Sequence, residues 1–144
     1  MNAVVPKESE LRKVLLLSSD EVETAFLQEM LNESVTVTVT RKLSETLARL
    51  DEGSHDVFFC DWRFGRGTWR EALERVQDRD PLMPAIVILP AGEEYERLEV
   101  LEAGAFDLLA LPWRRMAVIA VLEHALASRD AQLHRSVRMK CQHS

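Results

Sequence analysis

The segment Asp56-Val57-Phe58-Phe59-Cys60-Asp61 contains a short apolar run that ends abruptly at a carboxylate. A run of this length is too short for a helix and suits a strand that is covered on both faces of a sheet. Similar aliphatic or β-branched runs occupy residues 13–17, 35–40, 85–89 and 106–111. Because helical patterns separate these runs, the sequence predicts an α/β domain of repeated βα units around a five-stranded parallel sheet.

Five helices are predicted between and after the strands. Their apolar stripes, with spacings of three and four, lie within residues 21–33, 43–50, 69–76, 98–105 and 116–133. The strand at 35–40 alternates Val with Thr, which predicts a half-exposed strand at an edge of the sheet. Trp69 begins an apolar stripe and is expected in the core. Residues 62–68, which include Gly65 and Gly67, are expected to form a flexible loop.

The composition indicates one globular domain. The 144 residues are enough to bury a core, and the predicted organisation is a flexible N-terminal segment at 1–11, a domain at 12–128 and a helical extension or tail at 129–144. A net charge of -6 argues against direct nucleic-acid binding. No apolar run approaches the ~20 residues that cross a bilayer. Residues 1–10 lack the apolar region of a secretory signal, so a cytoplasmic location without membrane contact is expected.

The cysteines and histidines predict neither a metal site nor a redox site. Cys60 and Cys141 lie far apart without a CxxC spacing, and Cys60 is expected to be a small core residue. The histidines share no spacing typical of metal ligands.

Chemistry in an open α/β sheet is expected just beyond the carboxyl ends of the strands, where a crevice forms. The residues at these positions are Ser18, Ser19, Asp20, Asp61, Pro90, Ala91 and Leu111. Only Asp20 and Asp61 among them are ionisable, and Asp20 is expected to cap the helix that follows. Asp61 is therefore expected to lack crowding by like charges, and the pattern gives only a weak indication of a metal site.

The order of these features resembles the receiver domain of bacterial two-component response regulators. The resemblance covers roughly residues 12–127. It depends on segments 13–20, 56–61 and 84–91, and on Glu102-Ala103-Gly104-Ala105 followed by Pro112-Trp113. It implies a doubly wound, flavodoxin-like sheet with strand order 2-1-3-4-5 and five helices. It also implies that Asp61 stands at the family's phosphoryl-accepting position.

Most other functional positions of that family are changed in this chain. Ser18 and Ser19, beside Asp20, replace the metal-binding acids, Pro90 replaces a Ser or Thr, Leu108 replaces an aromatic switch residue, and Leu111 replaces a lysine. Phosphoryl transfer depends on a metal and on positive charge to neutralise oxygen atoms. The sequence therefore predicts a degenerate, non-enzymatic pseudo-receiver with impaired or absent phosphorylation at Asp61 and weak or absent Mg²⁺ binding.

Two alternatives remain open. Asp61 could still accept a phosphoryl group by an altered route, which would make the protein an active switch. The region of Ser18, Ser19, Asp61 and Arg63 could instead bind a small anionic ligand.

The expected partners are proteins, such as a sensor kinase or an output module. The resemblance implies a homodimer through the fourth helix, the fifth strand and the fifth helix. Leu133 and Val137 continue the apolar pattern of the fifth helix past residue 128. This continuation suggests either a frayed, charged tail or a signalling helix that leads to a partner protomer or an output domain.

Overall fold

A five-stranded parallel sheet forms the centre of the molecule. The computed structural model describes residues 12–64, 67–90, 96–110 and 112–142. The strands are β1 (Arg12–Leu17), β2 (Val35–Thr40), β3 (Val57–Asp61), β6 (Ala85–Leu89) and β7 (Asp107–Ala110). They lie in the order β2-β1-β3-β6-β7 with every pair parallel. This confirms the predicted flavodoxin-like order and the edge position of the Val-Thr strand.

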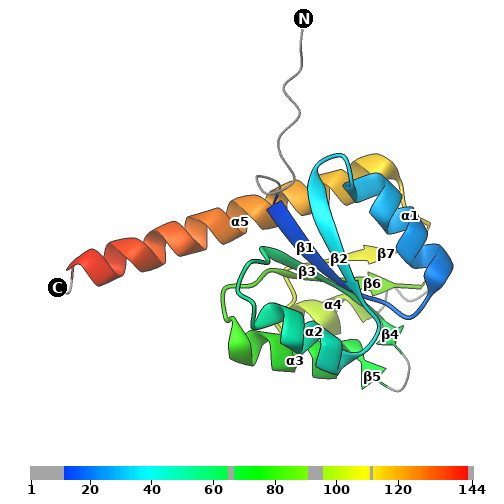
Figure 1. Ribbon diagram of the computed structural model, residues 1–144, viewed down its shortest axis with the longest axis horizontal. Coiled ribbons are helices and arrows are strands. Elements are labelled where there is room, and N and C mark those ends of the chain that lie inside the picture. The colour runs from blue at the N-terminus through cyan, green and yellow to red at the C-terminus, as the bar shows by residue number, and fades with distance from the viewer. Residues whose placement is uncertain (1–11, 65–66, 91–95, 111, 143–144) are drawn as a thin grey trace, which may run out of the picture.

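Helices cover both faces of the sheet (Figure 1). The helices α1 (Glu21–Leu31) and α5 (Arg115–Gln142) lie on one face, and α2 (Leu43–Leu50), α3 (Trp69–Arg79) and α4 (Arg97–Glu102) lie on the other. Alternating strand side chains divide the core between the faces. Leu15 and Phe58 pack toward α2 and α3, whereas Leu16 and Phe59 pack toward α1 and α5. Cys60 is buried, as expected. In the part of the chain that the structure describes, no helix has both the length and the apolar character to cross a membrane.

A small antiparallel hairpin follows β3. β4 (Arg63–Phe64) pairs with β5 (Gly67–Thr68), so the prediction of a flexible loop is wrong for the described part of this segment. Phe64 is buried against Gly67, where a Cβ atom would overlap the Phe64 ring. The rings of Trp62 and Trp69 stack at the base of the hairpin with centroids 6.0 Å apart. These aromatic contacts fix the segment that directly follows Asp61.

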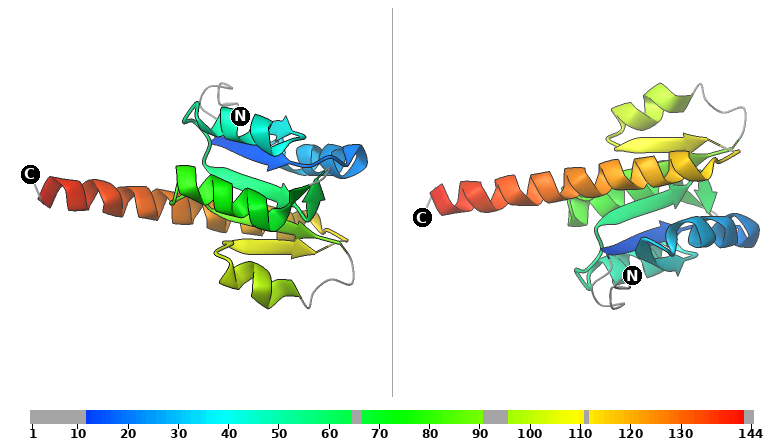
Figure 2. Two further views of the ribbon diagram at one scale, coloured as in Figure 1. Left: turned by 90° about the horizontal axis from the view of Figure 1, so that it is seen from below. Right: turned by 90° about the horizontal axis from the view of Figure 1, so that it is seen from above.

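The helix α5 continues past the apolar pattern at 116–133 into the segment that was predicted as a helical extension or tail. It continues without a break to Gln142, and its second half projects beyond the sheet, as Figure 2 shows. Where the helix leaves the body of the domain, Arg129 is buried and donates two hydrogen bonds of 2.9 Å to Asp80. Arg12 of β1 binds Asp130 at 2.9 Å. Ion pairs therefore hold the helix on the body up to residue 130.

Candidate functional site

The carboxyl end of β3 places Asp61 beside two residues that follow β1. Ser18 is fully buried, and its Oγ lies 3.4 Å from Oδ2 of Asp61 and 3.3 Å from Oε2 of Glu23. Glu23 lies in the first turn of α1, so the Ser18 hydroxyl brings its carboxyl group next to that of Asp61. The backbone N–H of Trp62 donates to Oδ1 of Asp61 at 2.9 Å. Ser18, Glu23 and Asp61 thus form one polar group of side chains, the acidic cluster.

Asp20 serves as the N-cap of α1, as the sequence predicted. Its backbone is extended, and its Oδ1 accepts a hydrogen bond of 2.9 Å from the N–H of Glu23. Its own N–H donates to Oγ of Ser18 at 3.3 Å. The capped first turn of α1 is what carries the Glu23 side chain to the end of β3.

Glu23 is not among the predicted site residues, because only residues directly after the strands were expected at the site. A signal was present in the spacing of Asp20 and Glu23. A capping residue followed three positions later by Glu forms a capping box, in which the Glu side chain turns back toward the start of the helix. Here the capping side chain follows that pattern, and the Glu23 carboxyl group reaches Asp61.

Burial and negative charge raise the pKa values of both carboxyl groups in the acidic cluster. For Glu23, burial is the largest cause, followed by the hydrogen bond with Asp61 and the charges of Asp61 and Asp20, and its pKa rises to about 8. Burial also raises the pKa of Asp61, although hydrogen bonds with Glu23, the Trp62 N–H and Ser18 oppose the rise. The prediction that Asp61 lacks crowding by like charges is therefore wrong. The pair therefore keeps a proton to higher pH than isolated carboxyl groups do.

The acidic cluster does not fit a divalent cation in this arrangement. Mg²⁺ prefers carboxylate oxygens and water in an octahedral shell. Ser18 and Ser19 stand where the resemblance implies acids, Asp20 caps α1, and Glu23 holds a proton. Within residues 12–64, 67–90, 96–110 and 112–142, no three His, Cys, Asp or Glu side chains are arranged to hold a metal ion.

The other predicted positions contribute differently. Pro90 follows β6, is half-buried and offers neither a hydroxyl nor an N–H group. Leu108 of β7 is buried in the core on the side of α4. Ser19 is exposed, and Leu111 lies outside the described residues. Of the predicted residues, the structure brings Ser18 and Asp61 into contact, with Asp20 joined to Ser18 through its backbone.

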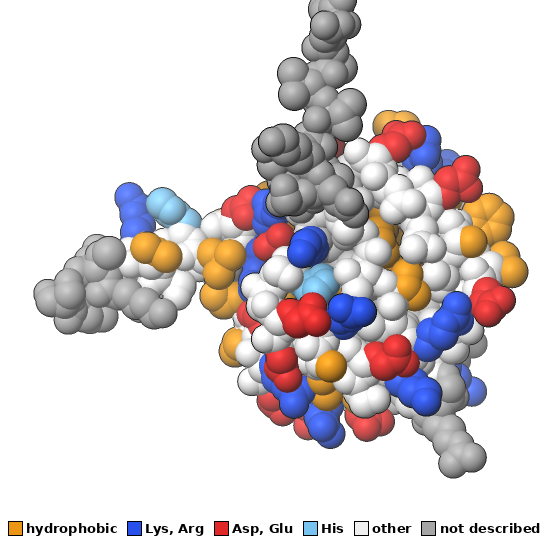
Figure 3. Space-filling view, viewed as in Figure 1, with side chains coloured by type: hydrophobic (Ala, Val, Ile, Leu, Met, Phe, Trp, Pro, Cys, Tyr) orange, Lys and Arg blue, Asp and Glu red, His pale blue; other side chains and the backbone are white. Residues whose placement is uncertain are grey.

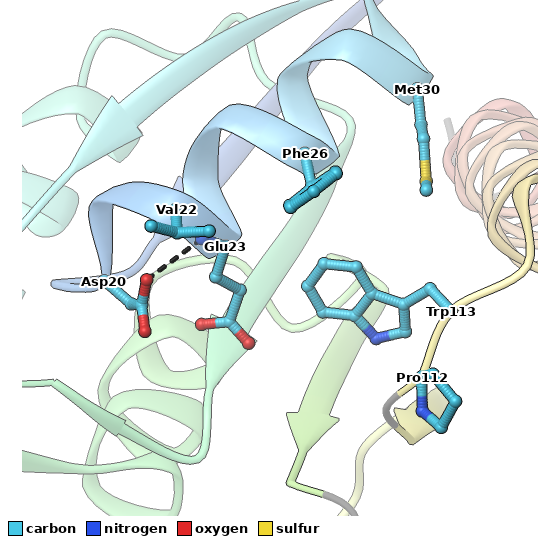
Figure 4. A pocket seen from close by; sticks show the side chains of 7 residues that line it. All are labelled: Asp20, Val22, Glu23, Phe26, Met30, Pro112 and Trp113. Atoms are coloured by element: carbon cyan, nitrogen blue, oxygen red, sulfur yellow. Dashed lines mark hydrogen bonds between the residues drawn. The ribbon is translucent and has the colours of Figure 1, made fainter.

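A groove of about 410 Å³ opens beside the acidic cluster, between α1 and the segment after β7 (Figure 4). Its lining residues are Asp20, Val22, Glu23, Phe26, Met30, Pro112 and Trp113. The side chains of Phe26 and Trp113 point toward one another, and the carboxyl groups of Asp20 and Glu23 lie at one end. This feature, the α1 groove, is apolar with an acidic end.

Comparisons with known proteins agree with the fold. Residues 14–123 match the family model described as the response regulator receiver domain. The transcriptional regulatory protein CpxR of Klebsiella pneumoniae is 29% identical over 111 residues, which cover 76% of this chain and 47% of CpxR. The chain therefore spans about half the length of this relative.

Solved receiver domains share the architecture. The signal receiver domain of an HD domain-containing protein from Pseudomonas fluorescens Pf-5 has a TM-score of 0.79 at 19% identity and covers 94% of this chain and 99% of its own. A response regulator receiver domain protein from Clostridium thermocellum has a TM-score of 0.78 at 18% identity, with coverages of 85% and 99%. Since the family model spans most of the chain and the sheet has the matching order, the chain belongs to the response regulator receiver domain family of two-component signalling.

Proposed function

We propose that this receiver domain signals through protein contacts and that phosphorylation at Asp61 is impaired or absent. The observation that carries the proposal is the Ser18 hydroxyl, which lies within 3.4 Å of both the Asp61 and the Glu23 carboxyl groups. A neutral hydroxyl and a second acidic side chain thus stand at the acceptor position, where phosphoryl transfer requires a cation.

The surroundings of Asp61 support the same conclusion. The groups bonded to it in the described structure are the Ser18 hydroxyl, the Glu23 carboxyl and the Trp62 N–H, and none of them is cationic. The sequence also carries Leu111 where the resemblance implies a lysine. Loss of one stabilising group of this kind costs ~10²–10³ in rate, so the combined changes leave little transfer.

A titration with Mg²⁺ and beryllofluoride tests the proposal. Trp62 follows Asp61 directly, so its fluorescence reports binding at that carboxylate. We expect unchanged emission at millimolar ligand, and no stable mass increase of the intact protein after incubation with acetyl phosphate. Saturable quenching that disappears in Asp61→Asn would show an active acceptor and contradict the proposal.

The proposed partners are a sensor kinase or an output module in the cytoplasm, together with a second copy bound through α4, β7 and α5. Leu98 and Leu101 are exposed on α4, and a hollow of about 460 Å³ extends over β7 and the start of α5. Exposed apolar side chains of this kind mark protein contacts. Leu101→Asp should weaken self-association in sedimentation equilibrium, and an unchanged association constant would contradict this contact.

Binding of a small anionic ligand is the other function that the sequence leaves open. The negative charge of the acidic cluster disfavours it. An anion near Asp61 would meet the charges that already raise the pKa of Glu23. We therefore expect no thermal shift with millimolar phosphate or nucleotide.

A further inference from the structure

The outer side of α1 carries an apolar row that the fold leaves uncovered. Val22 is 67% exposed and Phe26 is 54% exposed, and their spacing of four places them on one face of the helix. Glu21 and Glu29 border this row, where a shallow hollow of about 360 Å³ includes all four side chains. The α1 groove lies beside the same row, and Trp113 forms its far wall (Figure 4).

This surface is acidic as well as apolar. Residues 14–40 contain the acids Asp20, Glu21, Glu23, Glu29 and Glu33 and no lysine or arginine. Arg41 pairs with Glu21 at 3.8 Å and Arg115 pairs with Glu33 at 4.0 Å, near the two ends of α1. These two arginines offset the charges of Glu21 and Glu33, whereas Glu29 takes part in no ion pair among the described residues. The α1 surface therefore favours a partner with an apolar row and basic neighbours.

The projecting part of α5 has the complementary pattern. Leu133 is 39% exposed and Val137 is 60% exposed, again four residues apart. His134 and Arg138 form the adjacent row, and residues 131–144 contain no Asp or Glu. Figure 3 shows hydrophobic and basic side chains side by side along this part of the helix. An amphipathic helix of this type fits an apolar groove with an acidic border.

The projecting helix does not reach the groove of its own chain. α5 begins at Arg115, close to Trp113 in the groove wall, and runs away from it, so that α1 and the far end of α5 lie at opposite sides of the molecule (Figure 1). Leu133 lies about 18 residues later, which is roughly 27 Å along a straight helix. The projecting part of α5 from a second molecule therefore matches the chemistry of the α1 groove and can occupy it.

We propose that residues 131–138 of α5, the α5 extension, dock on the α1 surface of a second copy of this chain. Leu133 and Val137 pack on Val22 and Phe26, while Arg138 faces Glu29. Two such contacts form reciprocally, which closes a dimer and doubles the buried area of an otherwise small contact. This contact is separate from the α4, β7 and α5 face and does not depend on whether Asp61 is phosphorylated.

A complementation experiment tests the contact. Phe26→Asp removes the receiving surface and Val137→Asp removes the docking surface, and both are made in a Leu101→Asp background so that the α4 face does not contribute. Both residues are exposed, so the fold is retained, which circular dichroism checks. We expect the background protein to dimerise in sedimentation equilibrium and each variant alone to associate at least about tenfold more weakly. An equimolar mixture of the two variants should form a 1:1 complex, because one intact contact remains.

Charge reversal tests the register. Glu29→Lys and Arg138→Glu should each weaken the dimer, and the double variant should recover most of the association. The proposal is overturned if Phe26→Asp dimerises as well as its background, because the extensions would then pair with each other. It is also overturned if the Leu101→Asp background protein stays monomeric. The α1 surface would then bind a partner other than a second copy of this chain.

Discussion

The hydroxyl of Ser18, directly after β1, lies 3.4 Å from Oδ2 of Asp61 at the end of β3 and 3.3 Å from Oε2 of Glu23 on the first turn of α1. Burial and neighbouring charges raise the pKa values of both carboxyl groups. The same contact that occupies the acceptor carboxylate also makes stability depend on pH.

The free energy of unfolding should fall as the pH rises through about 8. The pKa of Glu23 is about 8 in the folded protein against an ordinary value of 4.5, mainly because of burial. The folded state thus keeps a proton that the unfolded state releases, so stability is lost as pH rises through the folded pKa. Since Glu23 is only half-buried, screening limits the loss to on the order of 1 kcal/mol between pH 7 and 8. Urea denaturation across this range measures it.

Glu23→Gln is the matched control, because it keeps a hydrogen-bonding side chain of the same size and removes the titration. Its stability should be nearly constant between pH 7 and 8, below the range in which the unfolded Cys60 thiol titrates. Burial lowers the pKa of His55, so its titration falls below this range. A slope equal to that of the wild type would exclude Glu23 as the titrating group.

Ser18→Ala should raise the pKa of both carboxyl groups. The hydrogen bonds of Ser18 lower the pKa of Glu23 and of Asp61, so removing the hydroxyl removes this effect. Carbon-13 NMR of the carboxyl groups should show titration midpoints at higher pH than in the wild type. Ser44→Ala, at an exposed site on α2, is the control and should leave the midpoints unchanged. A downward movement in Ser18→Ala would contradict the assignment.

Arg129→Ala should destabilise the protein by roughly 2–4 kcal/mol, because it leaves the partly buried Asp80 carboxylate without its bidentate partner. Arg49→Ala is the comparison, since the exposed pair of Arg49 and Glu52 at 3.4 Å contributes only about 0.5 kcal/mol or less. Chemical denaturation of both variants measures the difference. Equal losses would show that the Arg129 pair is no stronger than a surface pair.

Gly67→Ala should cost about 1–3 kcal/mol, because the added methyl group overlaps the Phe64 ring in the hairpin. Gly53→Ala separates this effect from backbone strain. Gly53 has a φ of 77° and nothing within 4 Å of an added Cβ, so only the left-handed backbone penalty of about 1–2 kcal/mol applies. If Phe64→Leu reduces the cost of Gly67→Ala, the overlap is the cause; thermal unfolding of the single and double variants decides this.

The sheet could be predicted because each strand has its own local signal. The apolar runs at 57–60 and 85–89 are buried on both faces, and the Val-Thr alternation at 35–40 marks an edge. The strand order came from the resemblance, which fixes the topology that short runs alone leave open. The hairpin after Asp61 was missed because two-residue strands have no periodicity, and the Phe64 contact that fixes them is tertiary.

The site could be predicted only in part. Ser18 and Asp61 follow strands directly, so their proximity follows from the topology. Glu23 reaches Asp61 because the capped first turn of α1 points its side chain there. The number of residues between Glu23 and the end of β1 does not reveal this orientation. Arg129 interrupts an apolar stripe in the sequence, yet it is buried because Asp80 supplies its counter-charge from another element.

The position of Arg129 within α5 has a mechanical consequence. The ion pair with Asp80 lies near the middle of the helix, with comparable lengths on either side. Before this pair the helix buries Val118, Leu122 and Ala125 on the sheet, whereas its second half extends beyond the sheet. Because a continuous helix carries any tilt of its packed half to its projecting end, a partner at that end senses the orientation of the helix on the sheet.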